Sequence, residues 1–360
     1  MRHRGLAEFM LQCGLQDDQG FVLVSERELI GPIDRILVIN VARIGDTILA
    51  VPVLRALRAA YPEAEIVCLA HPKRVDVLQG LPQIDQSAAI SKRSAPFMGW
   101  LGKSYDLALV FGHEPALLSY ALRAARQVVA LPSGNPDIDS RLLAMVPDKG
   151  ILHAVDDRLR WLDVLQIQPS SRRLDYQVTE AEHKFAASWF IDHCGDKRPR
   201  VGFQIASFPT KAYRNWPQEN FENLGQRLLA RYPEAQILIF GDRPDAVAGE
   251  ALAKALGSRC HSLAGKLSLR QTLALMAKLD LYVGVDTGPT HLAGALGIPM
   301  VAMYHCLHPG RYLAPLEHPR YLGVVEHPVD LDRASTSCTM DAIAVDNVWE
   351  HVERALATEA

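Results

Sequence analysis

Short, uninterrupted apolar runs, each followed by a loop and a segment with helical spacing, constrain the fold of this chain more than any other feature. The first run is Ile-Leu-Val-Ile at residues 36–39, and the apolar positions 48, 51, 54 and 57 that follow mark one face of a helix over residues 47–61. A strand that is apolar on both faces is typical of a parallel sheet covered by helices on each side. The alternation therefore predicts an α/β protein with doubly wound, Rossmann-like sheets.

The alternation continues in both halves of the chain. We expect further strands at residues 65–70, 106–111, 200–205, 236–240, 281–285 and 300–304. We expect further helices at residues 73–79, 116–125, 217–231, 269–279 and 289–296. A chain of 360 residues is longer than the chains that usually fold around a single hydrophobic core. We therefore predict an extension over residues 1–30 and two domains, over residues 31–175 and 176–360. The second domain ends in a helix, and two such sheets bind ligands at strand ends in the cleft between them.

Composition narrows the class of protein. A formal net charge of −3 gives no overall attraction to nucleic acid. Six cysteines without C-x-x-C spacing argue against a disulfide scaffold or a structural zinc site and suit reduced thiols in the cytoplasm. The first residues do not form a secretory signal, and no apolar run has the length of a membrane helix. We expect a cytoplasmic protein whose association with a membrane is at most a contact with its surface.

Three loops that follow predicted strands carry candidate site residues. In the first, residues 41–47, Arg43 offers a fork for an anion, Gly45 permits close approach of a ligand, and Asp46 stands at a helix start. The alternative interpretation of Asp46 is a plain N-cap for a helix beginning at Thr47.

The second loop contains Gly-Val-Asp-Thr-Gly-Pro-Thr-His at residues 284–291. Asp286 and Thr287 follow a buried strand, Gly288 exposes backbone N–H groups, and the helix that begins there can hold a diphosphate. The alternative is capping by Asp286 or Thr287, with His291 as an ordinary helix residue.

The third loop, residues 207–217, places Lys211 and Arg214 before a Trp-Pro pair. These cations could neutralise a leaving diphosphate, or they could be solvated surface charges. We reject a metal site at His305, Cys306 and His308, because no second ligand cluster supports one.

Basic residues outnumber acidic ones between positions 91 and 130. They are Lys92, Arg93, Lys103, Arg123 and Arg126, against Asp106 and Glu114. Such a surface suits an anionic lipid or a phosphorylated acceptor, and a merely solvated face is the alternative.

Together, the Arg-Ile-Gly-Asp loop at 43–46, the Trp216-Pro217 loop, Leu263-Ala264-Gly265 with Ser268-Leu269, and the Asp-Thr-Gly-x-x-His block at 286–291 resemble glycosyltransferase family nine. That family contains the ADP-heptose:lipopolysaccharide heptosyltransferases. The resemblance runs from Arg35 to the C-terminus and implies a GT-B fold, with an acceptor-binding first domain and a donor-binding second domain. It also implies inverting transfer without a metal or other cofactor.

The resemblance also implies roles for single residues. Asp46 matches the general base, with Arg43 and Gly45 on the acceptor side, and Asp286 matches the donor-sugar contact beside Thr287, Gly288 and His291. Asp242, Gly265 and Lys266 match the region that seats the nucleoside. The family usually has Lys where this chain has Arg214, which leaves Arg214 and Lys211 as alternative phosphate ligands.

The resemblance implies transfer of heptose, or a related sugar, from ADP-heptose to a lipopolysaccharide core or similar glycan, and we expect at most peripheral contact with the inner membrane. Two other classes stay open: a non-hydrolysing nucleotide-sugar epimerase, which needs further acid and base groups, and a non-catalytic nucleotide-sugar binder, which has no use for the Asp46 loop.

Overall fold

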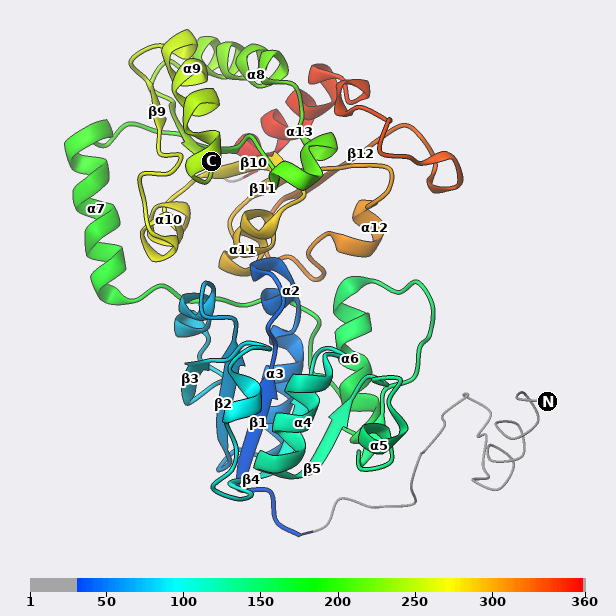
Figure 1. Ribbon diagram of the computed structural model, residues 1–360. Helices are drawn as coiled ribbons and strands as arrows, with labels where there is room; N and C mark the ends of the chain where they lie inside the picture. Colours follow the sequence, from blue (N-terminus) through cyan, green and yellow to red (C-terminus); the bar gives the residue numbers. More distant parts are fainter. Residues whose placement is uncertain (1–30, 359–360) are drawn as a thin grey trace. The chain divides into compact units, whose positions relative to one another are not determined.

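The computed structural model describes residues 31–358, so the expected extension over residues 1–30 lies outside the described residues. The chain divides into two compact units, each built on a six-stranded sheet (Figure 1). Among the described residues, the first unit takes in 31–43, Ala50–Leu152 and Asp156–Ser170, and the second takes in Ile44–Leu49, His153–Val155 and 171–358. The predicted α/β class with two parallel sheets is confirmed.

The first sheet has the strand order β3-β2-β1-β4-β5-β6, with every neighbouring pair parallel. Its strands are β1 (Arg35–Ile39), β2 (Glu65–Ala70), β3 (Gln86–Ala89), β4 (Tyr105–Val110), β5 (Ala125–Ala130) and β6 (Ala144–Met145). The helices along this part of the chain are α3 (Val51–Ala60), α4 (Pro115–Ala124), α5 (Pro136–Asp139) and α6 (Ala154–Val164), with 3-10 turns η1 (Val75–Gly80) and η2 (Ala95–Phe97). The order in which strands are added reverses between β1 and β4, because β2 and β3 lie on one side of β1 and β4, β5 and β6 lie on the other.

Apolar side chains fill both faces of the first sheet. On one face, Leu37 and Ile39 of β1 pack with Leu118 of α4 and Ala95 of η2 in a single buried cluster. This packing places η2 against α4, on the same side of the sheet.

The second sheet has the order β12-β11-β10-β7-β8-β9 and is also parallel throughout. Its strands are β7 (Arg200–Gln204), β8 (Gln236–Phe240), β9 (Cys260–Ser262), β10 (Leu281–Val285), β11 (Met300–Tyr304) and β12 (Leu322–Glu326). Its helices are α2 (Ile44–Leu49), α7 (Glu180–Cys194), α8 (Gln218–Arg231), α9 (Ala246–Leu256), α10 (Leu269–Met276), α11 (Gly288–Leu296), α12 (Gly310–Leu313) and α13 (Val345–Thr358), and its 3-10 turns are η3 (Pro209–Arg214), η4 (Arg243–Asp245), η5 (Leu331–Arg333) and η6 (Met340–Ala342). Here the direction reverses between β7 and β10.

One predicted helix is wrong in its bounds. The helix expected over residues 47–61 is two helices, α2 and α3, which are separated at Ala50. Pro52 lies in the first turn of α3, where its ring and missing N–H prevent one continuous helix from running through. Asp46 therefore lies in the first turn of α2 and does not cap a helix beginning at Thr47.

Several strands were not predicted, among them the short or exposed strands β3, β9 and β12 and the longer, mostly buried strand β5. All four residues of β3 are exposed, so that strand has no apolar run by which to recognise it. Between residues 31 and 358, no helix has the length and apolar character needed to cross a membrane. All five cysteines of this part of the chain are free thiols.

Candidate functional site

The point where the second sheet reverses its direction brings two of the predicted loops together. β7 and β10 are hydrogen-bonded neighbours, and both end at the same edge of the sheet. Arg214 follows β7 and Asp286 follows β10 directly. In open α/β sheets this reversal point is where a crevice for ligands forms at the carboxyl ends of the strands.

The loop after β7 is anchored at its far end. Trp216 is buried, donates its indole N–H to the carbonyl of Ile343 at 2.9 Å, and packs edge-on against Phe221. The Asn215 side chain accepts a hydrogen bond from the backbone N–H of Ser207 at 2.7 Å, which closes the base of the loop. The cations of η3 are therefore presented from a fixed turn.

Arg214, Asp286 and His291 form a buried charged group. Arg214 Nη1 donates to Asp286 Oδ2 at 2.7 Å, and His291 Nε2 lies 3.6 Å from Asp286 Oδ1. Only 14% of the Arg214 side chain and 5% of the Asp286 side chain are exposed, so the pair is shielded from water. Burial raises the pKa of Asp286, and the charges of His291 and Arg214 oppose that rise. Burial also lowers the pKa of His291, which favours a neutral imidazole.

Two buried nitrogen atoms of this group have no hydrogen-bond partner among the described residues, Arg214 Nε and His291 Nδ1. A buried donor without a partner is costly, and a bound anion or polar ligand would satisfy it. The geometry thus leaves hydrogen-bonding capacity for a ligand beside Asp286.

The start of α11 is not capped by the side chain of Asp286 or Thr287, which was the alternative role considered for these residues. Thr287 occupies the N-cap position, but its side chain makes no capping hydrogen bond. The Asp286 carboxylate is turned toward Arg214 instead. Thr290 donates its hydroxyl to the carbonyl of Val285 at 2.6 Å and so ties the first turn to the end of β10. Without a capping side chain, the positive end of α11 stays available to an anion.

The short helix α2 packs against α11 in the second unit. Glycines make this close approach possible: a Cβ on Gly45 would lie 2.7 Å from His291 Cδ2, and one on Gly288 would lie 3.5 Å from the Gly45 nitrogen. Asp46, the next residue, is close enough to Asp286 for its negative charge to raise the pKa of that carboxyl. Arg43 is an exposed residue of the first unit, immediately before α2.

Lys211 is held by a short polar chain. Its ammonium donates to the Tyr213 hydroxyl at 3.3 Å, and that hydroxyl lies 3.1 Å from His308 Nε2. Burial, together with the charges of Arg214 and Lys211, lowers the pKa of His308 to about 4. His308 is therefore neutral at pH 7, and the two cations remain the positive groups of this loop.

The three residues expected near the nucleoside lie after β8 and β9. Gly265 has a left-handed φ of +70° and donates its N–H to the carbonyl of Gly241 at 3.0 Å, which holds it beside Asp242. Lys266 forms an exposed ion pair with Glu250 at 2.6 Å. These residues form a second group at the same sheet edge as the Arg214 and Asp286 pair.

Sequence reasoning missed two buried polar residues at strand ends. Gln204 ends β7 with its Oε1 unpartnered, and Tyr304 ends β11 with its hydroxyl unpartnered among the described residues. The negative charge of Asp286 contributes to raising the pKa of Tyr304, so the tyrosine lies near the charged group. A polar side chain that closes an apolar strand was the signal that could have found both.

Other polar side chains of this region hold the backbone. His305 Nε2 lies 2.8 Å from the carbonyl of Cys338, and the N–H of Leu307 donates to His305 Nδ1 at 3.1 Å. Within residues 31–358, no three His, Cys, Asp or Glu side chains are arranged to hold a metal ion.

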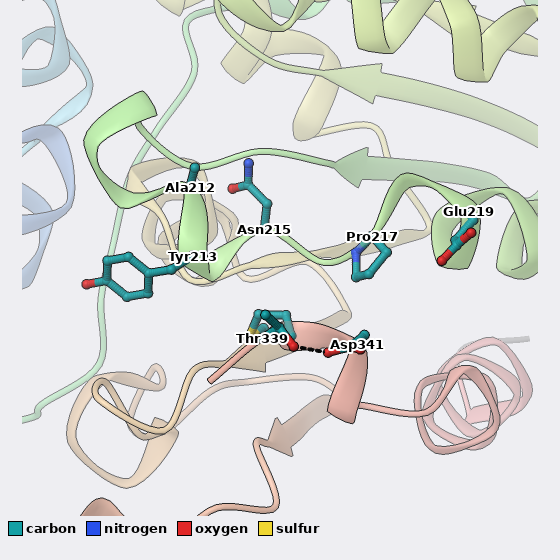
Figure 2. A pocket seen from close by; sticks show the side chains of 8 residues that line it. Ala212, Tyr213, Asn215, Pro217, Glu219, Thr339 and Asp341 are labelled. Atoms are coloured by element: carbon teal, nitrogen blue, oxygen red, sulfur yellow. Dashed lines mark hydrogen bonds between the residues drawn. The ribbon is translucent and has the colours of Figure 1, made fainter. Parts of the chain in front are cut away.

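An open hollow lies beside the charged group (Figure 2). The residues before and within the start of α8 line one side of it, and the segment around Thr339 and Asp341, which are hydrogen-bonded to each other, lines the other. Tyr213 contributes to the wall, but its ring points away from Pro217 and Glu219. Neither Arg214 nor Asp286 lines this hollow, but Tyr213 and Asn215, the neighbours of Arg214 in the chain, do. The hollow is therefore adjacent to the candidate site and not part of it.

Comparison with known proteins adds independent findings. Residues 151–328 match the family model for glycosyltransferase family 9 (heptosyltransferase). Lipopolysaccharide heptosyltransferase 2 of Salmonella typhimurium is 27% identical over 314 residues, which cover 79% of this chain and 86% of that protein. A family 9 glycosyltransferase structure from Veillonella parvula superposes with a TM-score of 0.77 at 20% identity, covering 90% of this chain and 97% of the other. The ADP-heptose heptosyltransferase II structure from Escherichia coli gives a TM-score of 0.69 at 22% identity, covering 90% and 99%. The two-domain GT-B fold expected from the resemblance is confirmed.

Proposed function

The chain is a heptosyltransferase-like glycosyltransferase of family 9, and on that premise we propose that it transfers heptose, or a closely related sugar, from ADP-heptose to a lipopolysaccharide core or related glycan. The relatives named for lipopolysaccharide heptose transfer support the acceptor class, and the structure named for an ADP-heptose heptosyltransferase supports the donor. The reaction we propose is a single displacement that inverts the anomeric centre and needs no metal.

The observation that carries this proposal is the pairing of α2 with α11. It brings Asp46 into the same electrostatic environment as Asp286, and Arg214 contacts Asp286 directly. A general base and a donor-binding group must be neighbours for a direct transfer between two bound substrates. A protein that only binds a nucleotide sugar has no need of the carboxylate on α2.

In the proposed step, the Asp46 carboxylate takes the proton of an acceptor hydroxyl as its oxygen attacks the anomeric carbon of the donor. The bond between that carbon and the diphosphate oxygen breaks on the opposite face, and its electron pair leaves with the diphosphate. One displacement from the opposite face inverts the configuration. Arg43 and Gly45 are proposed to lie on the acceptor side of this step.

The leaving diphosphate is proposed to bind where positive charge and N–H groups converge. Lys211 offers an ammonium held at Tyr213, Arg214 has an unpartnered and buried Nε, and α11 contributes the N–H of Gly288 at its positive end. Charge-assisted hydrogen bonds of this kind stabilise an oxyanion most in a water-poor site. We propose that Arg214 also orients Asp286 on the sugar, with Thr287 and His291 beside it.

The nucleoside is proposed to lie against Asp242, Gly265 and Lys266. Their position beyond β8 and β9 is further along the same sheet edge from Arg214, which is the order that a nucleoside diphosphate requires. A lipid-linked acceptor would also bring the protein to the inner membrane surface, and we propose a peripheral contact there.

The test is product analysis with ADP-heptose, with and without a delipidated core acceptor. We expect a new glycoside of inverted anomeric configuration only when the acceptor is present, at a rate unchanged by EDTA. Isomerised sugar nucleotide in the absence of acceptor would point to an epimerase, and binding without turnover would point to a sugar-nucleotide binder. Either result would overturn the proposal.

A further inference from the structure

The connection between β3 and β4 exposes three large apolar side chains within five residues. Phe97 is 83% exposed, Trp100 71%, and Leu101 fully exposed. The other large exposed apolar side chains of the described chain, such as Ile191 and Val247, are scattered singly. Single exposed apolar residues are ordinary, whereas a contiguous group marks an interaction site.

This group is held in place by polar contacts. Arg123 of α4 donates to the carbonyls of Ala95 at 2.7 Å and Met98 at 3.0 Å, and its guanidinium lies 4.5 Å from the centre of the Trp100 ring. Trp100 donates its indole N–H to the carbonyl of Pro96 at 2.9 Å. Gly99, with a φ of +77°, supplies the turn between them. The loop is thus fixed while its apolar side chains face solvent.

Basic residues flank the apolar group in the sequence. Lys92, Arg93 and Lys103 are all exposed, and residues 91–104 contain no acidic residue. The nearest acid in sequence, Asp106, accepts hydrogen bonds from the N–H groups of Asp34 and Arg35 and forms an ion pair with Arg126 at 3.4 Å. These contacts compensate the negative charge of Asp106. Residues 91–104 therefore carry a net positive charge.

We propose that Lys92, Arg93, Phe97, Trp100, Leu101 and Lys103, which we call the aromatic–basic patch, dock on an anionic phospholipid bilayer. Aromatic and aliphatic side chains at the tip enter the headgroup region, and the surrounding Lys and Arg are attracted to the negative lipid surface. Neither contribution anchors a protein well by itself, and the patch combines both.

The same charge pattern disfavours a second copy of this chain as the partner of the patch. Two copies that met through this patch in a two-fold dimer would bring like charges face to face. The cores of protein interfaces are depleted in Lys, whereas here lysines flank the apolar tip. This inference rests on the proposed function, because a lipid-linked acceptor gives the enzyme a reason to work at a bilayer.

The test uses the full chain and sedimentation with vesicles that contain neither acceptor nor nucleotide. One set of vesicles is phosphatidylcholine alone, and the other includes phosphatidylglycerol. We expect at least about tenfold tighter binding to the anionic set, because each basic side chain near the surface contributes about fivefold in affinity. Raising the salt from about 0.05 M to about 0.5 M should reverse most of that gain, because it shortens the screening length.

Two paired variants locate the contact. Trp100→Ser with Leu101→Ser should weaken anionic-vesicle binding by at least about tenfold, because it removes apolar carbons from the headgroup region. The matched control, Ile191→Ser with Val247→Ser, removes exposed apolar side chains elsewhere and should leave vesicle binding unchanged. Lys92→Gln, Arg93→Gln and Lys103→Gln together should also weaken binding, whereas Lys184→Gln, Lys197→Gln and Lys254→Gln should not.

Several results would overturn the docking proposal: no binding to anionic vesicles, patch variants that bind like the wild type, or control variants that lose as much as the patch variants. A change of oligomeric mass in the patch variants without a change in vesicle binding would assign the patch to a protein partner. Donor affinity and turnover on a delipidated acceptor are measured for the same variants and should be normal. A failed docking proposal therefore appears in the vesicle data alone, and a failed transferase proposal appears in turnover.

Discussion

At the scale of single residues, Asp286 is the most constrained group of the candidate site. Its carboxylate is buried, contacts Arg214 at 2.7 Å, and lies near His291 and Asp46. The Asp-Thr-Gly-x-x-His spacing was enough to single out Asp286, Thr287 and His291 from the sequence. The ion pair with Arg214 was not predictable, because it joins loops that are 72 residues apart.

Asp286→Asn should weaken donor affinity by at least about tenfold, because the neutral amide loses a charge-assisted contact to the sugar. It should also lower the melting temperature, because Arg214 keeps a buried charge without its counterion. Calorimetric titration with ADP-heptose and thermal melting measure the two effects. Asp192→Asn, at an exposed position of α7, is the control. Unchanged donor affinity would remove Asp286 from the binding site.

Lys211→Ala and Arg214→Ala should differ in their effects. Among the described residues, the Lys211 ammonium makes one hydrogen bond, to the Tyr213 hydroxyl at 3.3 Å. Loss of the side chain should therefore lower kcat and leave the melting temperature unchanged. Arg214→Ala should lower both, because it leaves Asp286 buried without its cation. Steady-state rates and melting curves on the same preparations make the comparison. If neither variant changes kcat, these cations do not bind the leaving group.

His308 should contribute to the loss of stability in acid. Burial and the nearby cations lower its pKa from 6.5 to about 4 in the folded protein. Between these two values the unfolded chain binds more protons than the folded one, so stability rises with pH and is lost as the pH falls. His308→Gln retains a hydrogen-bonding group for Tyr213 and removes this titration. The melting temperature of the variant should therefore fall less between pH 7 and pH 4.5 than that of the wild type, and an identical fall would contradict the assignment.

At the scale of elements, the contact between α2 and α11 matters most. The sequence predicted the strands that are long apolar runs, such as β1 and β10, because a buried parallel strand is a continuous apolar run, and it missed others, such as β3 and β9. It did not predict the break at Ala50, and it did not predict that Ile44–Leu49 would group with the second unit. The break has a local cause, Pro52, which the helical spacing of the apolar residues concealed. Long-range packing decides the grouping of Ile44–Leu49 with the second unit, and local spacing does not show it.

Gly45→Ala should disturb this contact, because the added Cβ would lie 2.7 Å from the His291 ring. Overpacking of this kind costs about 1–3 kcal/mol, which lowers the melting temperature by several degrees. Gly288→Ala on the facing helix is the matched control, since its Cβ would meet nothing closer than 3.5 Å. A Gly45→Ala protein that melts like the control would show that the helices do not need the glycine.

At the scale of the whole molecule, the two parallel sheets follow from alternating strands and helices, whereas the GT-B fold was implied by the resemblance to glycosyltransferase family nine. The candidate residues follow from loops at strand ends, where parallel sheets gather ligands. The unpartnered atoms of Gln204, Tyr304 and Arg214 could not be predicted, because a hydrogen bond that is missing is visible only once every neighbour is known. The candidate residues that the sequence proposed are therefore those in motifs, and those it missed are single polar groups at the ends of apolar strands.

The central claim, that Asp46 is the base of a direct transfer, is tested by Asp46→Asn. The substitution keeps the size of a residue in the first turn of α2 and removes its basicity. Initial rate, donor affinity and melting temperature are measured on one preparation. Turnover should fall by about 100-fold or more while donor affinity stays within about threefold and the melting temperature scarcely moves, because general base catalysis contributes about 10²- to 10⁴-fold. A stable, donor-binding Asn variant with full activity would contradict the mechanism.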